Sequence, residues 1–280
     1  MKLQFTKMQG AGNDFVVVDA TRTPFRPTPD LLARLADRRF GVGCDQILVV
    51  EPAQESGVDF NYRIFNADGS EIGQCGNGSR CLARFIRDQK LSSKDVVRVR
   101  TQTSLLDLYL QDDGQVRVNM GVPVLDPAQV PFTGATARAL RYALTPDGSA
   151  RVEFAAVSMG NPHAVIEVVD VEHEPVERIG RALQADTAFP ESVNVGFLQI
   201  IDEHQVVLRV YERGAGETLA CGSGACAAVV AGRLWGRLSE QVNVRVRGGM
   251  LRLEWAGEGQ PVWMTGPAET VFTGEIEWQN

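Results

Sequence analysis

The sequence predicts an α+β fold of two pseudosymmetric domains, each a mostly antiparallel sheet around a central helix. The first observation is a repeated motif: residues 71–78 read EIGQCGNG and residues 217–224 read ETLACGSG, which places Cys221 146 positions after Cys75. The second is that the order of expected elements also repeats. The third is that strand patterns outnumber helical ones and are joined by tight turns. Such self-similarity is typical of an internal duplication.

The expected elements follow one order in both halves. An apolar strand is followed by a helix opened by an acidic residue and a proline, two strands, a Gly-rich loop with the cysteine, a long helix and three closing strands. In the first half these are residues 15–18, 29–38, 47–50, 59–65, 80–89, 96–100, 105–110 and 116–120. In the second half they are residues 164–169, 175–183, 195–201, 206–211, 225–235, 242–246, 251–255 and 262–265.

The domain boundary is expected near residues 121–123, after the last closing strand of the first half. The N-terminal half therefore comprises residues 1–121 and the C-terminal half residues 122–267. The segment 268–280 is expected to join the first half, because residues 271–278 form an extra strand pattern beyond the second repeat. The Pro/Thr/Ala-rich stretch 123–139 is predicted to be an interdomain or surface segment.

Composition narrows the class of protein. The chain has 280 residues, 44% of them hydrophobic, a net charge of −7 and a pI near 5.1, which argues against a nucleic-acid or membrane partner. No apolar stretch reaches the roughly 20 residues of a membrane span, and the start has no signal-peptide pattern. We therefore expect a soluble, cytoplasmic protein. Five cysteines without an export signal indicate reduced thiols.

Cys75 and Cys221 each stand just before a predicted helix, followed by Gly-Asn-Gly or Gly-Ser-Gly. A helix N-terminus has unpaired backbone N–H groups and a partial positive charge, and glycine lets a ligand approach them. Such a site can hold a carboxylate and lower the pKa of an adjacent thiol. Two such sites predict two thiols that face one ligand from opposite sides.

This pairing suits inversion of a carbon centre. One thiolate can remove the α-proton of an amino acid while the opposite thiol delivers another proton. The carbanion gathers charge on a carboxylate to which the helix N–H groups point, and stabilisation of developing charge is usually a large catalytic effect. Two bases on opposite faces can invert the centre without rotation of the intermediate.

Polar residues at or near matching points of the two halves are candidates for holding the rest of a substrate. They are Asn13, Gln46, Asn66, Asn161, Asn194, Glu212 and Arg213. Arg213 is suited to grip a second carboxylate through two hydrogen bonds. His163 and Glu212 are candidates for tuning the thiols' protonation. The mismatched positions, where Asn66, Ala67 and Asn77 correspond to Glu212, Arg213 and Ser223, would distinguish the two ends of a substrate.

Other roles for the cysteines remain open alternatives. Cys44, Cys81 and Cys226 are interpreted as buried core thiols. Cys75 and Cys221 could instead be a dithiol that cycles through a disulfide in a redox-switch protein. The Cys75–Cys81 and Cys221–Cys226 spacings do not match usual zinc ligand pairs, so no metal is expected. A formal dinucleotide fingerprint at residues 222–227 is weak, because no apolar strand runs directly into it.

Motifs along nearly the whole chain resemble the diaminopimelate epimerase family. They are GAGNDF at 10–15, GVGCDQ at 41–46, NADGS at 66–70, QCGNG at 74–78, GNPH at 160–163, NVGF at 194–197, YERGAGE at 211–217 and ACGSGAC at 220–226. The resemblance implies cofactor-independent interconversion of LL- and meso-2,6-diaminopimelate in lysine and cell-wall precursor synthesis. It also implies two domains that close over the substrate. A proline or hydroxyproline racemase of the same fold is the nearest rival.

The same resemblance implies roles for particular residues. Cys75 and Cys221 would be the acid/base pair, with His163 and Glu212 modulating them. Substrate would be bound by Asn13, Gln46, Asn66, Gly76, Asn77, Asn161, Asn194, Glu212, Arg213, Gly222 and Ser223. A homodimer is also implied. Phe272 departs from the family pattern, because many members have a tyrosine near this position, and phenylalanine lacks the hydroxyl that would hydrogen-bond at the dimer contact.

Overall fold

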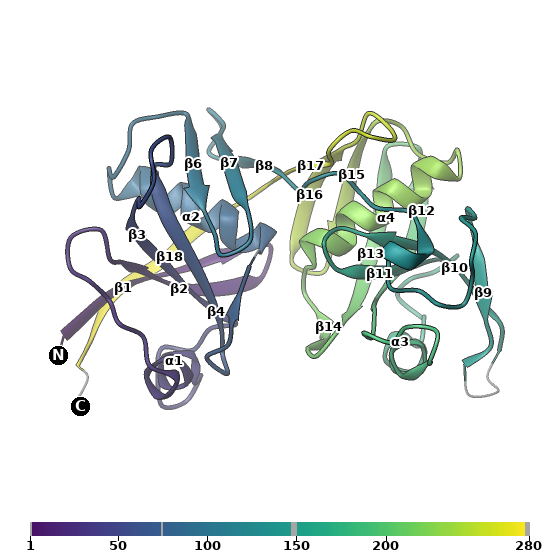
Figure 1. Ribbon diagram of the computed structural model, residues 1–280, viewed down its shortest axis with the longest axis horizontal. Coiled ribbons are helices and arrows are strands. Elements are labelled where there is room, and N and C mark those ends of the chain that lie inside the picture. Colours follow the sequence, from purple (N-terminus) through teal and green to yellow (C-terminus); the bar gives the residue numbers. More distant parts are fainter. Residues whose placement is uncertain (1, 74, 147–149, 278–280) are drawn as a thin grey trace. The chain divides into compact units, whose positions relative to one another are not determined.

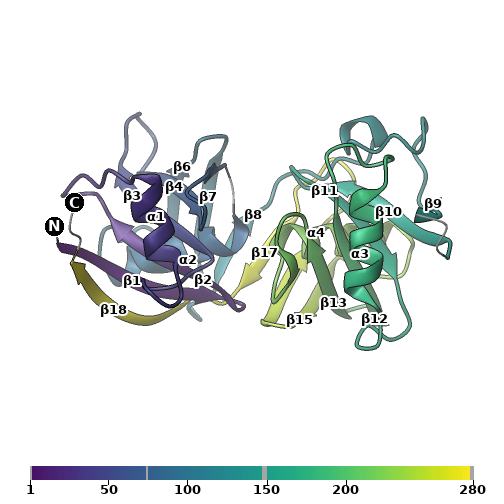
Figure 2. The ribbon, with the colours of Figure 1, turned by 90° about the horizontal axis from the view of Figure 1, so that it is seen from below.

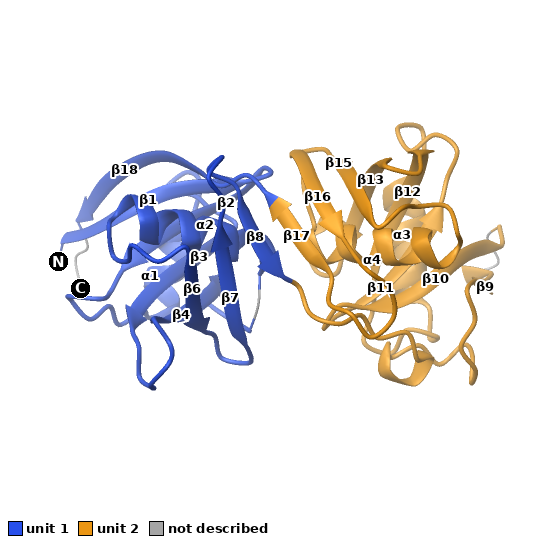
Figure 3. Cartoon of the chain, turned by 90° about the horizontal axis from the view of Figure 1, so that it is seen from above, with its two compact units in different colours: residues 1–119, 266–280 blue, residues 120–265 orange. Residues whose placement is uncertain are grey.

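The structure is a computed structural model that describes residues 2–73, 75–146 and 150–277. Gln74 of the first cysteine motif and Trp278 of the predicted tail strand lie outside the described residues. The chain forms two compact units, residues 1–119 with 266–280 and residues 120–265 (Figure 3). Each unit has its own strands and helices.

The first unit wraps a mainly antiparallel sheet around a long helix (Figure 1). Two of its strand pairs, β2–β3 and β4–β6, are parallel. The elements are β1 (Lys2–Gly10), β2 (Asn13–Asp19), α1 (Pro29–Ala36), β3 (Gln46–Pro52), β4 (Phe60–Asn66), β5 (Glu71–Ile72), α2 (Gly76–Asp88), β6 (Val96–Arg100), β7 (Leu105–Leu110), β8 (Val116–Asn119) and β18 (Glu269–Glu277).

The second unit repeats this plan around α4. Its parallel pairs are β11–β12 and β13–β15. The elements are the 3-10 turn η1 (Pro127–Gln129), β9 (Tyr142–Leu144), β10 (Val152–Ser158), β11 (Pro162–Glu167), α3 (Val176–Ala185), β12 (Asn194–Asp202), β13 (Gln205–Glu212), β14 (Gly216–Thr218), α4 (Gly222–Leu234), β15 (Gln241–Val246), β16 (Gly249–Glu254) and β17 (Trp263–Gly266). The predicted α+β class with mostly antiparallel sheets is confirmed.

Each long helix is covered by strands, and each shorter helix lies on the other side of the sheet. In Figure 2, α1 lies in front of the strands of the first unit and α2 behind them. Alternation along β2 explains this, because Val16 and Val18 pack in the cluster that contains the α1 leucines. The intervening Val17 is equally buried, so both faces of this strand are covered. A strand buried on both faces reads as a continuous apolar run.

Helix α1 begins and ends at identifiable caps. The Thr28 hydroxyl accepts a hydrogen bond from the Leu31 amide, and Pro29 occupies the first turn, where its missing N–H costs nothing. Asp37 has an extended backbone, with φ −63° and ψ 121°, so the helix ends at Ala36. The predicted helix 29–38 was therefore two residues too long.

The long helices begin earlier than predicted, at Gly76 and Gly222 rather than at Arg80 and Ala225. The apolar helical pattern starts only at residues 80 and 225, because glycine and asparagine disfavour helix interiors, although the Gly-x-Gly segment was expected to form the first turn. In the structure these residues form the first helical turn, and each cysteine is the N-cap itself. The consequence is that the backbone N–H groups of the Gly-x-Gly turn lie beside the thiol.

Two sequence predictions at the edges of the units need correction. Strands β1 and β10 were missed, because each lies just ahead of the apolar run that was taken as the first strand of its half. The stretch 123–139, predicted to be an interdomain or surface segment, instead places Val130 and Phe132 in the core of the second unit. Phe132 contacts Phe189 there, with ring centroids 4.9 Å apart.

The C-terminal tail forms β18, which pairs antiparallel with β1 from Lys2 opposite Glu277 to Gln9 opposite Glu269.

Within residues 2–73, 75–146 and 150–277, no helix combines the length and apolar character that a membrane crossing requires.

Candidate active site

Cys75 is the N-cap of α2. Its backbone is extended, with φ −147° and ψ 112°, and its sulfur accepts a hydrogen bond from the Gly78 amide at 3.4 Å. Ser79 donates both its amide and its hydroxyl to the Cys75 carbonyl, at 2.8 and 2.9 Å. The thiol is thus held at the positive end of the helix, as the spacing predicts.

Gly78 is required by a close approach. A Cβ at this position would lie 2.7 Å from the Tyr62 hydroxyl and 3.2 Å from Leu48. Tyr62 is buried, and burial raises its pKa well above the ordinary value, so its hydroxyl stays neutral. Any larger residue at 78 would have to displace this tyrosine from beneath the thiol's helix.

Two amides lie beside the Cys75 thiol. The thiol donates toward Asn13 Oδ1 at 3.9 Å, and Asn77 Nδ2 donates to the same oxygen at 3.3 Å. Asn77 is buried, and its own Oδ1 accepts from Arg80 at 2.9 Å. The structure therefore brings the predicted residues Cys75, Asn13 and Asn77 together.

A network of charged residues stands behind Asn13. Its amide Nδ2 donates to Asp45 at 2.7 Å, and Arg38 pairs with both Asp45 and Asp14. Lys7, which is largely buried, also pairs with Asp14, at 2.5 Å. Burial raises the pKa of Asp14, but hydrogen bonds from Arg38 and Lys7 outweigh it and lower the pKa to about 2. Asn13 is thus tied to a rigid ionic network.

Gln46 and Asn66 form a second pair of predicted binders in this unit. They face each other across β3 and β4, and Gln46 Nε2 donates to Asn66 Oδ1 at 2.9 Å. Gln46 Oε1 is buried and has no hydrogen-bond partner among the described residues. A buried acceptor without a donor is costly, so this oxygen is a candidate for receiving a ligand N–H group.

Cys221 is the N-cap of α4 but lies in a different environment. It is 5% exposed, and its sulfur lies 3.6 Å from the Ser223 hydroxyl. Burial raises its pKa well above the ordinary value, and the neighbouring Glu212 carboxylate raises it further. The expectation that the helix N-terminus lowers the thiol pKa is therefore wrong for Cys221 in this structure, because desolvation of the thiolate and the Glu212 charge outweigh it.

Glu212 connects Cys221 to β14. Its Oε1 accepts a short hydrogen bond from the Thr218 hydroxyl, and the carboxylate also receives a hydrogen bond from the Cys221 thiol. A carboxylate in direct contact with a thiol can take its proton, so Glu212 is well placed to tune Cys221.

His163 is connected to the cysteine of the second unit through two residues, Asn161 and Ser223. The ring is 1% exposed, its Nε2 lies 3.0 Å from Asn161 Oδ1, and Asn161 Nδ2 donates to Ser223 at 3.3 Å. Burial, with the Arg213 charge, lowers the pKa of His163 to about 3, so the ring is neutral. A neutral ring that donates through Nε2 leaves Nδ1 as an acceptor, and Nδ1 has no partner among the described residues.

Asn194 and Arg213 form a separate pair near this site. Asn194 Nδ2 donates to the Pro162 carbonyl at 3.0 Å, and its Oδ1 accepts from the Arg213 amide at 3.0 Å. The Arg213 guanidinium donates to the Glu191 carbonyl at 2.8 Å. The side chain is exposed, so its remaining donors face solvent.

Sequence reasoning missed several residues that complete these sites. Arg80 and Asp45 support the first cysteine and Thr218 the second. The sequence did point to Asp45, because this residue directly precedes Gln46 in the motif GVGCDQ at residues 41–46. His173 and His204 are exposed and lie outside these sites. All five cysteines lie within the described residues and are free thiols, and Cys44, Cys81 and Cys226 are buried.

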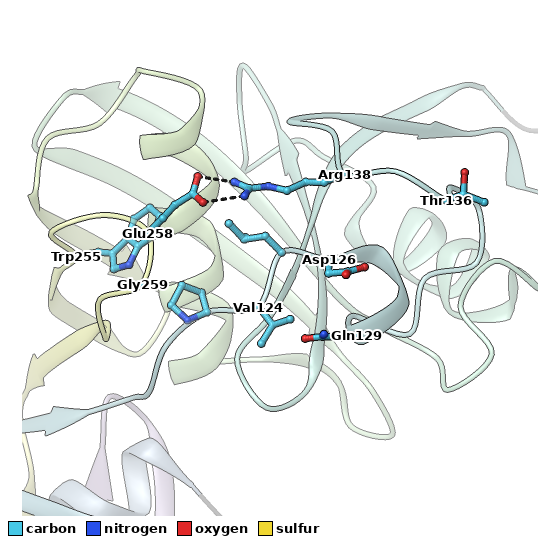
Figure 4. Close-up of a pocket in the computed structure, with 10 residues that line it drawn as sticks. Val124, Asp126, Gln129, Thr136, Arg138, Trp255, Glu258 and Gly259 are labelled. Atoms are coloured by element: carbon cyan, nitrogen blue, oxygen red, sulfur yellow. Dashed lines mark hydrogen bonds and ion pairs between the residues drawn. The ribbon is translucent and has the colours of Figure 1, made fainter.

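A surface pocket of about 410 Å³ in the second unit is separate from these residues. It is lined by Val124, Asp126 and Trp255, among others, and Figure 4 shows Arg138 and Glu258 paired at its edge. Both of their hydrogen bonds are short, 2.8 and 2.6 Å. None of the predicted site residues lines this pocket, so it is not the candidate active site.

The fold is shared with enzymes of known structure that have little sequence similarity to this chain. A hydroxyproline epimerase from Agrobacterium vitis, with bound trans-4-hydroxy-L-proline, matches with a TM-score of 0.71 and 15% identity over 98% of this chain and 92% of that one. A PhzF-family phenazine biosynthesis protein from Bacillus anthracis matches with a TM-score of 0.69 and 14% identity over 99% and 100%. At these identities the likeness defines the fold alone.

Sequence comparison is more specific. The profile described as diaminopimelate epimerase matches residues 5–125 and 155–271. The chain is 56% identical over 278 residues to a diaminopimelate epimerase from Alkalilimnicola ehrlichii, covering 99% of both chains. It is 55% identical over 277 residues to one from Aromatoleum aromaticum, again over 99% of both. The chain belongs to the diaminopimelate epimerase family.

Proposed function

We propose that this protein is an isomerase that interconverts LL- and meso-2,6-diaminopimelate without a cofactor, by proton transfer at two thiols. The observation that carries the mechanism is the pair of cysteines at the N-caps of α2 and α4, each followed by a Gly-x-Gly turn. Family membership supports the substrate and the reaction class. The pathway that follows is lysine and peptidoglycan precursor synthesis.

The reaction is two proton transfers at one carbon. One cysteine, as thiolate, takes the α-proton, and the C–H electron pair passes into the α-carboxylate as a carbanion. The other cysteine, as thiol, gives its proton to the opposite face, so the configuration inverts and the two sulfurs exchange protonation states. The backbone N–H groups at the helix starts stabilise the charge that develops on the carboxylate. The reverse reaction uses the same groups with exchanged roles.

Candidate binding groups supply what a diamino dicarboxylate needs. Carboxylates require N–H donors, which Gly76, Asn77, Gly222, Ser223 and Arg213 offer. Ammonium groups require acceptors, and Gln46 Oε1 is a buried acceptor that the protein leaves unpaired among its described residues. The remaining proposed binders are Asn13, Asn66, Asn161, Asn194 and Glu212. His163 and Glu212 are proposed to set the protonation of the Cys221 site.

A cytoplasmic homodimer completes the proposal. Reduced cysteines favour a reducing compartment. Val271 and Phe272 are 56% and 46% exposed on β18, and the Phe272 ring meets Phe5 edge to face, with centroids 6.0 Å apart. Exposed apolar side chains on a strand are suited to contact a second copy. Sedimentation of the wild type should give a dimer mass, and a Phe272→Asp variant should shift the population towards monomer.

A substrate panel tests the proposal against its nearest rival. LL-diaminopimelate should lose optical purity in the presence of enzyme, whereas proline and trans-4-hydroxyproline should not. Turnover of the prolines with none of diaminopimelate would assign the chain to the rival racemase activity. A redox-switch protein would show a reversible Cys75–Cys221 disulfide and no exchange of the α-proton with solvent.

A further inference from the structure

A chain of hydrogen bonds with a single direction runs through the first unit and passes the Cys75 thiol. Arg80 Nη2 donates to Asn77 Oδ1 at 2.9 Å, Asn77 Nδ2 donates to Asn13 Oδ1 at 3.3 Å, and Asn13 Nδ2 donates to Asp45 Oδ2 at 2.7 Å. Both amides point the same way, from a cation at one end to a carboxylate at the other.

The chemistry of the two end groups forces this direction. A guanidinium has only donors, so the atom of Asn77 that faces Arg80 must be the carbonyl oxygen. A carboxylate has only acceptors, so the atom of Asn13 that faces Asp45 must be the amide nitrogen. Each asparagine could otherwise turn its amide end for end, since oxygen and nitrogen have nearly the same shape.

Both ends are held in place by further contacts. Arg80 is fully buried and also donates to the Pro267 carbonyl at 3.2 Å. Asp45 accepts from Arg38 at 2.8 Å, and the Asp45 amide donates to Asp14 at 2.9 Å. Burial of an arginine is expensive, which indicates that Arg80 serves a specific arrangement rather than general stability.

The direction matters because of what it places beside the thiol. Asn13 presents its carbonyl oxygen to Cys75, and the S–H group donates to it at 3.9 Å. This contact favours the protonated sulfur, whereas the Gly78 amide, which donates to the same sulfur at 3.4 Å, favours the thiolate. A reversed Asn13 would replace this acceptor with a second N–H donor beside the sulfur.

We propose that Asp45 and Arg80 are positioning residues that lock the Asn77–Asn13 amides in one direction, so that Cys75 retains its proton in the substrate-free protein. The catalytic meaning rests on the proposed function, because a protonated Cys75 is a thiol that can deliver a proton to the substrate. The orientation itself is independent of any substrate.

Asp45→Asn should allow the Asn13 amide to adopt either orientation, because an asparagine side chain at position 45 can accept or donate a hydrogen bond. The full chain, reduced and without substrate, is treated with iodoacetamide at neutral pH, and alkylation of Cys75 is followed by peptide mass spectrometry. We expect Cys75 to react about fivefold faster than in the wild type, the ratio that one neutral hydrogen bond supplies. Asp45→Ser, which also removes the carboxylate, provides a second variant if Asp45→Asn does not fold.

Three controls separate orientation from charge. Asp45→Glu keeps an acceptor and should react near the wild-type rate. Asp19→Asn removes an exposed carboxylate of the same unit that takes no part in these hydrogen bonds, so the alkylation rate of Cys75 should stay at the wild-type value. In about 1 M KCl, where the screening length is only about 3 Å, a charge effect would disappear but an orientation effect persists. An unchanged rate in Asp45→Asn, or an acceleration abolished by salt, overturns the proposal.

The alkylation experiment can fail or succeed independently of the proposed function. Alkylation is measured without substrate, so a fivefold change would support the directed chain even in a protein that did not turn over diaminopimelate. Conversely, an active enzyme whose Cys75 reactivity ignored Asp45 would retain the proposed function and exclude this positioning role.

Discussion

The two cysteine sites share a helix start but differ in what lies behind each thiol. Around Cys75 the support is ionic, with Lys7, Asp14, Arg38 and Asp45 linked to Asn13. Around Cys221 it is formed by one buried neutral ring, His163, and one carboxylate, Glu212. The backbone plan was kept in both units, whereas the side chains near the two thiols diverged.

The amides also differ in what they offer the sulfur. In the first unit Asn13 turns an acceptor towards Cys75. In the second unit Ser223 accepts from Asn161, which leaves its own hydroxyl proton free to point at Cys221, 3.6 Å away. The Cys75 thiol thus donates to a neutral amide oxygen, whereas the Cys221 thiol donates to the charged Glu212 carboxylate. This difference provides a physical basis for unequal roles of the two cysteines.

Replacing either thiol should have the largest effect. Cys75→Ala and Cys221→Ala should each lower epimerisation of LL-diaminopimelate by about 10³-fold or more, because each removes one proton carrier. Cys81→Ala and Cys226→Ala, matched replacements within the same helices, should keep most of the turnover. Chiral chromatography of the product measures the rates. Robust epimerisation by either of the first two variants would contradict the two-thiol mechanism.

Glu212→Gln tests the carboxylate that the first site lacks. The pKa of Cys221 should fall from its raised value, because the carboxylate that repels the thiolate is gone, and alkylation of Cys221 should begin at lower pH. Turnover should drop about 10²-fold, since the thiol loses its adjacent proton acceptor. Glu240→Gln serves as an exposed control of the same unit. If the pH dependence of Cys221 alkylation were unchanged, Glu212 would not control the pKa of this thiol.

The two units should respond differently to acid. The pKa of His163 is lowered to about 3, so its stabilising contribution is complete above about pH 6.5 and is lost as the pH falls towards 3. Its upper limit is about 5 kcal/mol. The pKa of Asp14 is lowered to about 2, so its contribution in the first unit is lost only below about pH 4.

Hydrogen exchange of each unit between pH 7 and pH 3 measures this difference. Amides of the second unit should lose protection first, after correction for the intrinsic pH dependence of exchange. A His163→Gln variant should reduce that difference, because glutamine gains no proton on unfolding. Equal loss in both units at every pH would show that His163 does not control acid stability.

Arg80 should have the smallest of these effects, one on stability. Arg80→Met leaves Asn77 Oδ1 and the Pro267 carbonyl without this donor, which should lower the free energy of unfolding by about 1–3 kcal/mol. Arg80→Lys keeps a donor and a charge and should recover part of the loss. Chemical denaturation followed by circular dichroism measures both. A methionine variant as stable as the wild type would show that the hydrogen bonds from Arg80 to Asn77 and Pro267 do not contribute to stability.

Much of this architecture could be predicted from the sequence, because duplication makes each half a check on the other. The apolar periods defined β6 and β7, and the repeated Gly-x-Gly turn located both cysteines at helix starts. The apolar pattern of the long helix in the first unit starts only at residue 80, because helix propensity disfavours glycine, while packing against Tyr62 demands Gly78.

The unpredicted parts depend on contacts between residues distant in the sequence. Nothing in the order of residues indicated that Arg80 would reach Pro267, 187 positions away. The raised pKa of Cys221 depends on how deeply the thiol is buried and on a carboxylate from β13, and neither can be read from a motif. Local patterns placed the two cysteines at helix starts, whereas long-range packing determines the surroundings that shift the pKa of Cys221.

The central claim is that two thiols act on opposite faces of one carbon, and hydrogen isotope labelling tests it most directly. In ²H₂O each thiol carries solvent deuterium before the substrate binds. At low conversion of LL-diaminopimelate, the meso product should carry deuterium at the inverted carbon, while recovered substrate remains unlabelled. Nuclear magnetic resonance and mass spectrometry of both pools give the result. Product that retains the substrate's own hydrogen would show that a single group moves the proton, and would contradict the account.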